Sequence, residues 1–306
     1  MQIAMIGLGR MGGNMARRLQ KGGAKVVGFN RSFEVTKNLA RECGISAAAS
    51  LKDALDTLPQ PRITWLMLPA GEATETTIKE LAPLLAKHDI VIDGANAFYK
   101  DSIRRAAYFK ARDIGFVDAG VSGGVWGLEN GYALMLGGES IAIEQLLPFI
   151  KILAPAPDRG WLHCGPSGSG HYVKMIHNGI EYGMMQALAE GLALLRSRDD
   201  FNLDLAHVTE MWRHGSVVRS WLLDLTAQFL KEDQSLVDIQ PLVADSGEGR
   251  WTAMEAIERG VPTPVMSLAL MMRFASQGKN DYTAKLLAMM RKGFGGHAVS
   301  TGEKNE

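Results

Sequence analysis

GLGRMG, residues 7–12, is the stretch that decides the fold. It follows the apolar run QIAMI at 2–6 and opens a helix-forming run that ends near Lys21, after which a second apolar run, KVVGF, occupies 25–29. Glycines in this pattern let the backbone turn tightly and approach a pyrophosphate, while the helix N-terminus supplies free N–H groups. Alone the pattern is a weak signal, but between a strand and a helix it predicts a dinucleotide-binding β-α-β unit. The expected phosphate loop is Gly7, Leu8, Gly9, Arg10, Met11 and Gly12.

The end of the second apolar run bears on which dinucleotide is bound. NAD sites usually place an acidic residue there to hold the ribose 2′-hydroxyl. This chain has Asn30, Arg31 and Ser32 instead. Arg31 can pair with a 2′-phosphate, and its two neighbours can donate hydrogen bonds to it. The stretch therefore favours NADP, although an Arg31 that stacks on the adenine would leave the site open to NAD as well.

Further apolar runs alternate with helical patterns, as the strands and crossover helices of a parallel sheet do. These runs are 63–68, 90–93, 116–118 and 132–138. MLPAG at 67–71 and DGAN at 93–96 fall at the carboxyl edge, where open α/β sheets bind ligands. We expect Leu68, Pro69 and Ala70 to lie against the cofactor. Asn96 either connects cofactor and substrate or simply forms a turn.

Beyond residue 170 the apolar residues recur at spacings of three and four, which is typical of helices. The stretches are 173–195, 208–211, 217–230 and 265–275. We therefore expect an α/β protein, with a Rossmann-like doubly wound sheet at 1–166 followed by an all-α C-terminal domain at 167–299. The polar residues 300–306 are expected to form a disordered tail.

The composition excludes several classes of protein. The 306 residues include 33 lysines and arginines and 33 aspartates and glutamates, and this balance gives no sign of nucleic-acid or anionic-membrane binding. No apolar stretch reaches the ~18 residues of a membrane span. Two cysteines, Cys43 and Cys164, indicate neither a disulfide framework nor a thiolate metal site. We expect no metal and a cytoplasmic setting.

A second unusual stretch is HYVKMIHNGIEYG at 171–183. Drawn as a helix, it separates into an apolar arc and a chemically mixed polar arc. The apolar arc, with Val173, Ile176, Ile180 and Met184, is expected to anchor the helix between the two domains. The polar arc predicts one wall of a cleft, although an ordinary solvated face is the alternative. It contains Lys174, His177, Asn178, Glu181 and Tyr182.

GVSGGVWG at 120–127 follows an expected strand, and its glycines together with Ser122 offer hydrogen-bond donors to a carboxylate or hydroxyl. Combined with IGLGRMG, DGAN, the 171–183 helix, RSWLLDL at 219–225 and FGGH at 294–297, it resembles the 6-phosphogluconate dehydrogenases. The resemblance runs from Met1 to about Val299. The length is similar to the short form of that family, in which the helical domain is not duplicated.

The resemblance implies that 6-phosphogluconate is oxidised at C3 by NADP or NAD and decarboxylated to ribulose 5-phosphate. Lys174 matches the general base for the C3 hydroxyl, and Glu181 matches the acid that protonates C1 of the enediol. The implied substrate contacts are Asn96, Ser122, Gly123, Gly124, His177, Asn178, Tyr182, Arg273, Arg291 and His297. Of these, Tyr182, Arg273, Arg291 and His297 match residues that hold the phosphate or its neighbouring hydroxyls.

Three stretches depart from the family's pattern. DSGEGR at 245–250 looks like a shortened loop without the phosphate-binding lysine of the long form, Asn96 is followed by Ala97-Phe98, and SGG continues as Val125-Trp126. A related acid sugar therefore stays open as the substrate.

Two other classes also stay open. A 3-hydroxyisobutyrate-type dehydrogenase would have no need of Glu181, and a non-catalytic NADP-binding protein would be expected to lose Lys174 or Glu181. The apolar surface of 265–272 and 284–290 exceeds what a small domain covers. In the family such helices pack against a second subunit, which implies a homodimer or homotetramer.

Overall fold

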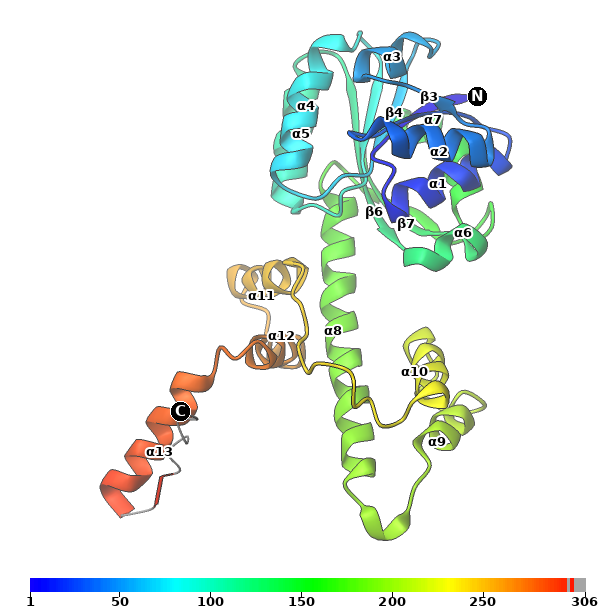
Figure 1. The fold of residues 1–306 in the computed structure, drawn as a ribbon. Coiled ribbons are helices and arrows are strands. Elements are labelled where there is room, and N and C mark those ends of the chain that lie inside the picture. The colour runs from blue at the N-terminus through cyan, green and yellow to red at the C-terminus, as the bar shows by residue number, and fades with distance from the viewer. Residues whose placement is uncertain (296–297, 300–306) are drawn as a thin grey trace. The chain divides into compact units, whose positions relative to one another are not determined.

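The computed structural model describes residues 1–295 and 298–299 of the chain. It divides into two compact units, Met1–His177 and Asn178–Glu306 (Figure 1). Residues 300–306, expected to be a disordered tail, lie outside the described residues, and so does His297. Among the helices that are described, none has both the length and the apolar character that crossing a membrane requires.

The N-terminal unit is built on one eight-stranded sheet in the order β3-β2-β1-β4-β5-β6-β7-β8. Neighbouring strands are parallel except for β6 and β7, which are antiparallel. The strands are β1 Gln2–Ile6, β2 Lys25–Phe29, β3 Ser46–Ala47, β4 Ile63–Leu66, β5 Ile90–Asp93, β6 Gly115–Ser122, β7 Ala133–Gly138 and β8 Trp161–Gly165. The chain runs outward from β1 to β3 and then crosses back to β4, so the expected doubly wound sheet is confirmed.

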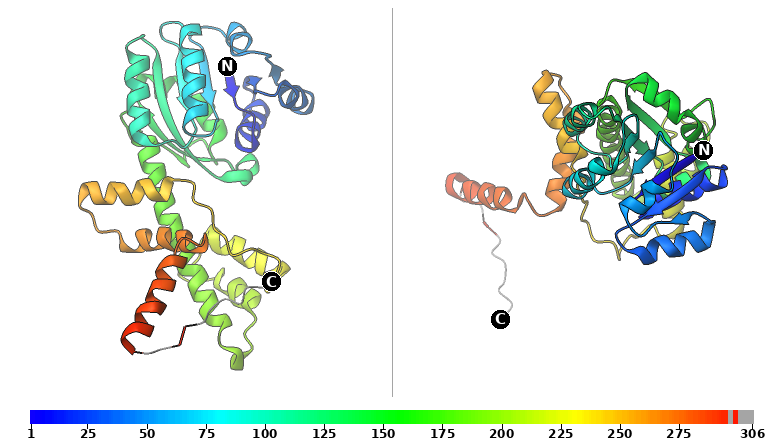
Figure 2. Two further views of the ribbon diagram at one scale, coloured as in Figure 1. Left: turned by 60° about the vertical axis from the view of Figure 1, so that its left-hand side comes forward. Right: turned by 90° about the horizontal axis from the view of Figure 1, so that it is seen from above.

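Helices cover both faces of this sheet (Figure 2). Because side chains alternate along a strand, Ile3 and Met5 of β1 join one apolar core and Ala4 and Ile6 join the other. The first core packs against α1 and α7, and the second against α3, α4 and α5. The helices of the unit are α1 Arg10–Lys21, α2 Phe33–Cys43, α3 Leu51–Asp56, α4 Glu72–Leu81, η1 Ala82–Leu84, α5 Tyr99–Lys110, η2 Gly124–Trp126, α6 Gly127–Asn130 and α7 Ser140–Leu153.

One 28-residue helix, α8 (Ser169–Arg196), begins in the N-terminal unit and continues into the second. The regular elements of the second unit are all helices among its described residues, as the spacing of its apolar residues predicts. Its further helices are η3 Asp199–Phe201, α9 Leu205–Trp212, α10 Trp221–Glu232, α11 Glu248–Arg259, α12 Pro264–Ser276 and α13 Asp281–Gly295.

Two expectations for the helical unit were wrong in detail. The helix expected at 217–230 begins only at Trp221, because the hydroxyl of Ser220 caps it by accepting the N–H of Leu223 at 3.1 Å. Residues 245–250, expected to be a loop, include the start of α11 at Glu248.

Burial along α8 does not follow the division into an apolar and a polar arc. Val173, Ile180 and Met184 of the apolar arc are exposed, Ile180 by 51%, so the expected anchoring role of this arc is wrong for these side chains. The buried side chains of the helix include Lys174 and Asn178. Lys174 and Asn178 of α8 therefore contact other residues of this chain, whereas Val173, Ile180 and Met184 form an apolar surface that the described chain does not cover.

Candidate active site

Two of the three fingerprint glycines are required by the fold itself. Gly7 has φ of +93°, and a Cβ added to it would lie 2.3 Å from the carbonyl oxygen of Met67. A Cβ on Gly12 would lie 2.0 Å from the carbonyl oxygen of Gly7. A Cβ on Gly9, by contrast, would meet no atom within 4 Å. Nothing in the described residues therefore demands glycine at position 9, and its small size keeps the approach to α1 open.

The N-terminus of α1 fits a pyrophosphate. Gly9 is its N-cap and no side chain caps the helix. The first N–H groups of an α-helix have no partner within the helix, so those of this turn are available to an anion at the positive end of the helix dipole. Within the loop, Leu8 is buried in the core and Met11 packs partly against it, while Arg10 is exposed.

At the end of β2, the three polar residues have different environments. The side-chain oxygen of Asn30 accepts the N–H of Leu8 at 3.1 Å, and its amide donates to the carbonyl of Ser32 at 3.4 Å. Asn30 therefore braces the glycine loop. Arg31 is exposed and makes no hydrogen bond or ion pair with any other residue that the structure describes. Arg31 and Ser32 are thus the two side chains here that remain available to a ribose or a 2′-phosphate.

The ends of β4 and β5 form the rest of this edge. Leu68 is half-buried, and Pro69 and Ala70 are exposed. Asn96 has φ of +49°, and its side chain makes two hydrogen bonds with the backbone of Val121: its amide donates to the carbonyl at 3.2 Å and its oxygen accepts the N–H at 3.0 Å. Asn96 therefore ties the end of β5 to the end of β6, in line with the turn-forming interpretation, and its contact with cofactor and substrate stays a prediction.

A buried ion network lies beneath the Asn96 turn. Asp93 and Arg105 are almost fully buried, and they pair at 2.6 Å. Asp93 also accepts the N–H of Ala95 at 3.1 Å, while Arg105 pairs with Glu75 of α4 at 2.6 Å. Hydrogen bonds from Arg104 and Arg105 lower the pKa of Glu75 from 4.5 to about 2. Removing Arg105 would leave the buried carboxylate of Asp93 without its ion-pair partner, whereas removing Asp93 would leave Arg105 paired with Glu75.

Lys174 lies against the end of β6. It is only 5% exposed, and a Cβ added to Gly120 would lie 2.4 Å from the Cβ of Lys174. Two residues further along, β6 ends at Ser122. Gly123 and Gly124 follow with positive φ, and a Cβ on Gly124 would meet nothing within 4 Å. The strand end thus brings the lysine, the Ser122 loop and the Asn96 turn to one edge of the sheet.

The glycine-rich loop expected at 120–127 is shorter in the structure, because its first three residues belong to β6. The expected strand at 116–118 extends to Ser122, because Ser122 pairs with Ala133 in the antiparallel ladder between β6 and β7. The loop therefore begins at Gly123. Its continuation is held to α1, since Asn14 donates to the carbonyl of Val125 at 3.3 Å.

In the C-terminal unit, the polar residues of α8 belong to a hydrogen-bonded cluster. The amide of Asn178 donates to the carboxylate of Glu248, which also accepts the hydroxyl of Ser246 at 3.1 Å. The hydroxyl of Tyr182 lies 3.2 Å from that of Ser246, and the guanidinium of Arg273 stacks over the Tyr182 ring at 3.5 Å. The structure thus brings together three of the residues expected from the sequence, Asn178, Tyr182 and Arg273.

Glu248 is the functional candidate that sequence reasoning missed. The sequence pattern at 245–250 predicts a loop there, although an acidic residue opening a helix that stops at a glycine, here Gly260, is a recognisable signal. Asp245 lies three residues before Glu248. Burial raises the pKa of Asp245, but the ion pair with Arg250 and the hydrogen bond from the N–H of Gly247 outweigh this effect and hold the pKa below its usual value.

The remaining expected residues are Glu181, His177 and Arg291. Glu181 lies on α8 seven residues after Lys174, about 10 Å further along the helix axis, and is half-buried. His177 is half-buried at the end of the N-terminal unit. Arg291 is exposed on α13 and makes no hydrogen bond or ion pair with the other described residues.

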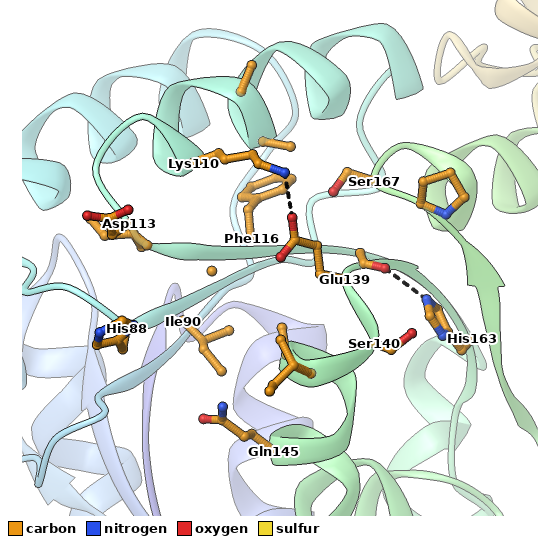
Figure 3. Close-up of a pocket in the computed structure, with 18 of the residues that line it drawn as sticks. His88, Ile90, Lys110, Asp113, Phe116, Glu139, Ser140, Gln145, His163 and Ser167 are labelled. Atoms are coloured by element: carbon orange, nitrogen blue, oxygen red, sulfur yellow. Dashed lines mark hydrogen bonds and ion pairs between the residues drawn. The ribbon is translucent and has the colours of Figure 1, made fainter.

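A separate groove of about 1100 Å³ opens at the opposite edge of the sheet (Figure 3). It lies where β5 and β6 begin, between α5 and α7, and is lined largely by apolar side chains such as Ile90 and Phe116. Lys110 and Glu139 pair at 2.8 Å beside it, and His163 hydrogen-bonds the carbonyl of Gly138 at 2.9 Å. The parallel strands place this groove at the other end from Asn96 and Ser122. It is therefore not part of the candidate active site.

The fold and this site define a class: an NAD(P)-binding oxidoreductase with a helical second domain. Residues 2–164 match the NAD binding domain of 6-phosphogluconate dehydrogenase, and residues 170–305 match the C-terminal domain of 6-phosphogluconate dehydrogenase. The chain belongs to the 6-phosphogluconate dehydrogenase family.

Individual relatives agree with this assignment. The chain is 42% identical to the NAD(+)-dependent, decarboxylating 6-phosphogluconate dehydrogenase of Haloferax volcanii over 98% of this chain and 99% of that protein. It is 37% identical to the NADP(+)-dependent enzyme of Bacillus subtilis over 92% of this chain and 62% of that longer protein. A solved structure of Plasmodium falciparum 6-phosphogluconate dehydrogenase, studied without ligand and with NADP+ or 6-phosphogluconate, matches with a TM-score of 0.83 at 30% identity. That match covers 100% of this chain and 67% of that chain.

Proposed function

We propose that this protein catalyses the oxidative decarboxylation of 6-phosphogluconate to ribulose 5-phosphate and CO2 with reduction of NAD(P). The observation that carries the proposal is the placement of Lys174. Its side chain is buried and packs on Gly120 near the end of β6. Gly120 lies two residues before Ser122, the last residue of that strand. The relative from Haloferax volcanii, matched over nearly its whole length, carries the same activity in its name.

Lys174 is proposed as the general base. In its neutral form it accepts the proton of the C3 hydroxyl while a hydride leaves C3, and the dinucleotide, when bound, supplies the nicotinamide that takes this hydride. The product is a β-keto acid. Ser122, Gly123 and Gly124 are proposed to hold its carboxylate or hydroxyl groups through the serine hydroxyl and backbone N–H groups.

Loss of CO2 from the β-keto acid generates an enediolate. The ammonium of Lys174, now protonated, stabilises the developing oxyanion. Glu181 is proposed as the acid that then delivers a proton to C1. One helix carries both groups, seven residues apart, which suits proton transfers at the two ends of a small substrate.

The cofactor contacts are proposed on the glycine loop and the strand ends. The open N-terminus of α1 and the absence of a side chain at Gly9 suit the pyrophosphate, and Arg31 with Ser32 suits a 2′-phosphate. NADP is therefore our preferred cofactor. NAD is the alternative, because the relatives named above include one dependent on each dinucleotide.

For the substrate phosphate we propose Tyr182, Arg273 and Arg291, together with His297, which lies outside the described residues. Arg273 is the best supported, since its guanidinium is held over the Tyr182 ring and donates to the carbonyl of Ala244 at 2.9 Å. His177 and Asn178 are proposed to position substrate and cofactor.

We also propose separate roles for the two domains and an oligomeric state for the protein. Residues 1–166 would form the dinucleotide-binding domain and 167–299 the substrate and dimerisation domain. A homodimer or homotetramer would cover apolar side chains that are exposed on α12 and α13, among them Val265, Leu268 and Leu287. Sedimentation that found a fully active monomer would contradict this. The two cysteines are unpaired, which suits a cytoplasmic setting.

One assay tests the activity: 6-phosphogluconate with NAD and with NADP separately, recording both reduced cofactor and released CO2. Lys174→Met should abolish cofactor reduction, whereas Lys151→Met, on α7, should not. Glu181→Gln should slow turnover by about 10²–10⁴-fold, and Glu190→Gln on the same helix serves as its control. Cofactor reduction without CO2 would reject the decarboxylating reaction and restore the alternative of a simple β-hydroxyacid dehydrogenase.

A further inference from the structure

The first turn of α8 is held by a buried carboxylate that the proposed reaction does not use. Asp118 of β6 is fully buried. One of its oxygens accepts the N–H of Gly168 at 2.6 Å, and the other accepts the N–H of His171 at 2.8 Å. Asp118 thus accepts the N–H of the residue just before α8 and one N–H of its first turn, which the helix itself leaves without an acceptor.

The side chain of His171 makes a second attachment. It is 1% exposed, and its Nδ1 is hydrogen-bonded to the hydroxyl of Ser102 on α5 at 2.7 Å. Its Nε2 is buried and has no hydrogen-bond partner in the described chain. A buried ring nitrogen without a hydrogen-bond partner lowers the stability of the fold, because it loses its hydrogen bonds to water. The bond to Ser102 is therefore the contact through which this ring fixes α8 to α5.

The backbone contacts around these two attachments leave α8 little room to move. A Cβ on Gly170 would lie 2.4 Å from the carbonyl oxygen of Met135 and 2.5 Å from that of Asp118. One turn further, the Cβ of Lys174 meets Gly120. The helix is thus in close backbone contact with β6 and β7 from its first turn to the lysine.

We propose that Asp118 and His171 are positioning residues that set the place of Lys174 at the end of β6. Asp118 fixes the axial start of α8, because its two oxygens bond backbone N–H groups on either side of Gly170. His171 fixes the rotation of the helix, because it lies three residues before Lys174 on the same face and is bonded to α5. The inference rests on the proposed role of Lys174 as the base.

Asp118→Asn tests the axial attachment. Asparagine has the same size but a single acceptor oxygen, so one of the two N–H groups loses its partner. We expect kcat per bound dinucleotide, with binding sites titrated by NADPH fluorescence, to fall about 100-fold, as for a catalytic group displaced by about 1 Å. The dissociation constant for NADPH should change far less than kcat per site, since most of its proposed contacts lie on the glycine loop and the strand ends, and only His177 and Asn178 lie on α8.

His171→Asn and His171→Gln form a matched pair for the rotational attachment. The asparagine amide lies near the position of Nδ1 and can keep the bond to Ser102, whereas the glutamine amide reaches the position of Nε2 and does not. We expect the glutamine variant to lose about tenfold in kcat per site, the worth of one hydrogen bond, and the asparagine variant to retain most of it.

Two outcomes would overturn the inference. If titratable sites fall in step with activity while kcat per site stays at the wild-type value, Asp118 and His171 act only on folding. If the asparagine and glutamine variants lose kcat per site equally, the bond to Ser102 does not position the lysine. A Lys174→Met variant that keeps wild-type turnover would instead reject the base assignment, which separates failure of the proposed function from failure of this inference.

Discussion

Gly120→Ala is the substitution whose effect follows most directly from the structure. Gly120 lies within β6 and does not have positive φ, so alanine carries no backbone penalty there. Its new methyl carbon, however, would lie 2.4 Å from the Cβ of Lys174 and 2.9 Å from the carbonyl oxygen of Gly170. Ordinary carbon–carbon contact is about 3.5–4.0 Å, so α8 must withdraw from the strand by roughly 1 Å.

A displacement of that size should lower both the turnover rate and the stability of the fold. Misplacing a catalytic group by roughly 1 Å costs about 100-fold in rate, or about 2.7 kcal/mol of transition-state stabilisation. Overpacking the buried contact should lower the free energy of unfolding by about 1–3 kcal/mol. Steady-state kcat with 6-phosphogluconate, the dissociation constant for NADPH and the thermal midpoint measure the three quantities. We expect only the cofactor affinity to stay near its wild-type value.

The control is Gly191→Ala on the same helix. A Cβ there would meet no atom within 4 Å, and replacing a glycine inside a helix should raise stability by up to about 1 kcal/mol. Its kcat should stay within about twofold of wild type. A Gly120→Ala protein with wild-type kcat would refute the claim that contact with β6 sets the position of Lys174.

Three further predictions concern the N-terminal unit. Arg31→Ala should raise KM for NADP by about 10–100-fold, the loss of one charged hydrogen-bonding partner, with little change for NAD; equal effects on both cofactors would reject a 2′-phosphate contact. Gly12→Ala should lower the thermal midpoint because its Cβ would lie 2.0 Å from a backbone carbonyl, whereas Gly9→Ala should leave the midpoint unchanged and weaken NADPH binding, as calorimetry would record. Because Arg104 and its neighbour lower the pKa of Glu75 from 4.5 to about 2, the stability from this carboxylate is present above pH 4.5 and lost as pH falls toward 2. Urea unfolding between pH 5 and 3 should therefore show a smaller loss of stability in Glu75→Gln than in the wild type.

The sequence predicted the parts of the fold that depend on local pattern. Strands β1, β2 and β5 have the expected bounds, since each is a short apolar run closed by a turn signal. The two-residue β3 and the half-exposed β8 were missed because neither is an apolar run. The extension of β6 to Ser122 depends on pairing with β7, a tertiary interaction that no local pattern encodes.

The same distinction holds for the candidate site. The glycine loop and the polar arc of α8 could be predicted because the spacing of their residues, together with the strand and helix patterns around them, places them together. The bracing role of Asn30 and the bond between Asn178 and Glu248 join residues 22 and 70 positions apart, so spacing carries no information about them. Asp118 was missed for a related reason: it reads as the last residue of a strand, and only the close approach of α8 shows that it caps a helix.

The continuity of α8 constrains how the length of this chain can vary. Each residue added to an α-helix rotates everything beyond it by about 100°. A single insertion or deletion between Lys174 and Glu181 would turn the proposed acid away from the face that carries the proposed base. Only an insertion of about seven residues, or two helical turns, would return Glu181 to the face of Lys174, and it would lengthen the distance between them by about 10 Å. Length variation among descendants of this gene should therefore be absent from this interval and concentrate in connections such as 197–204, where α8 has already ended.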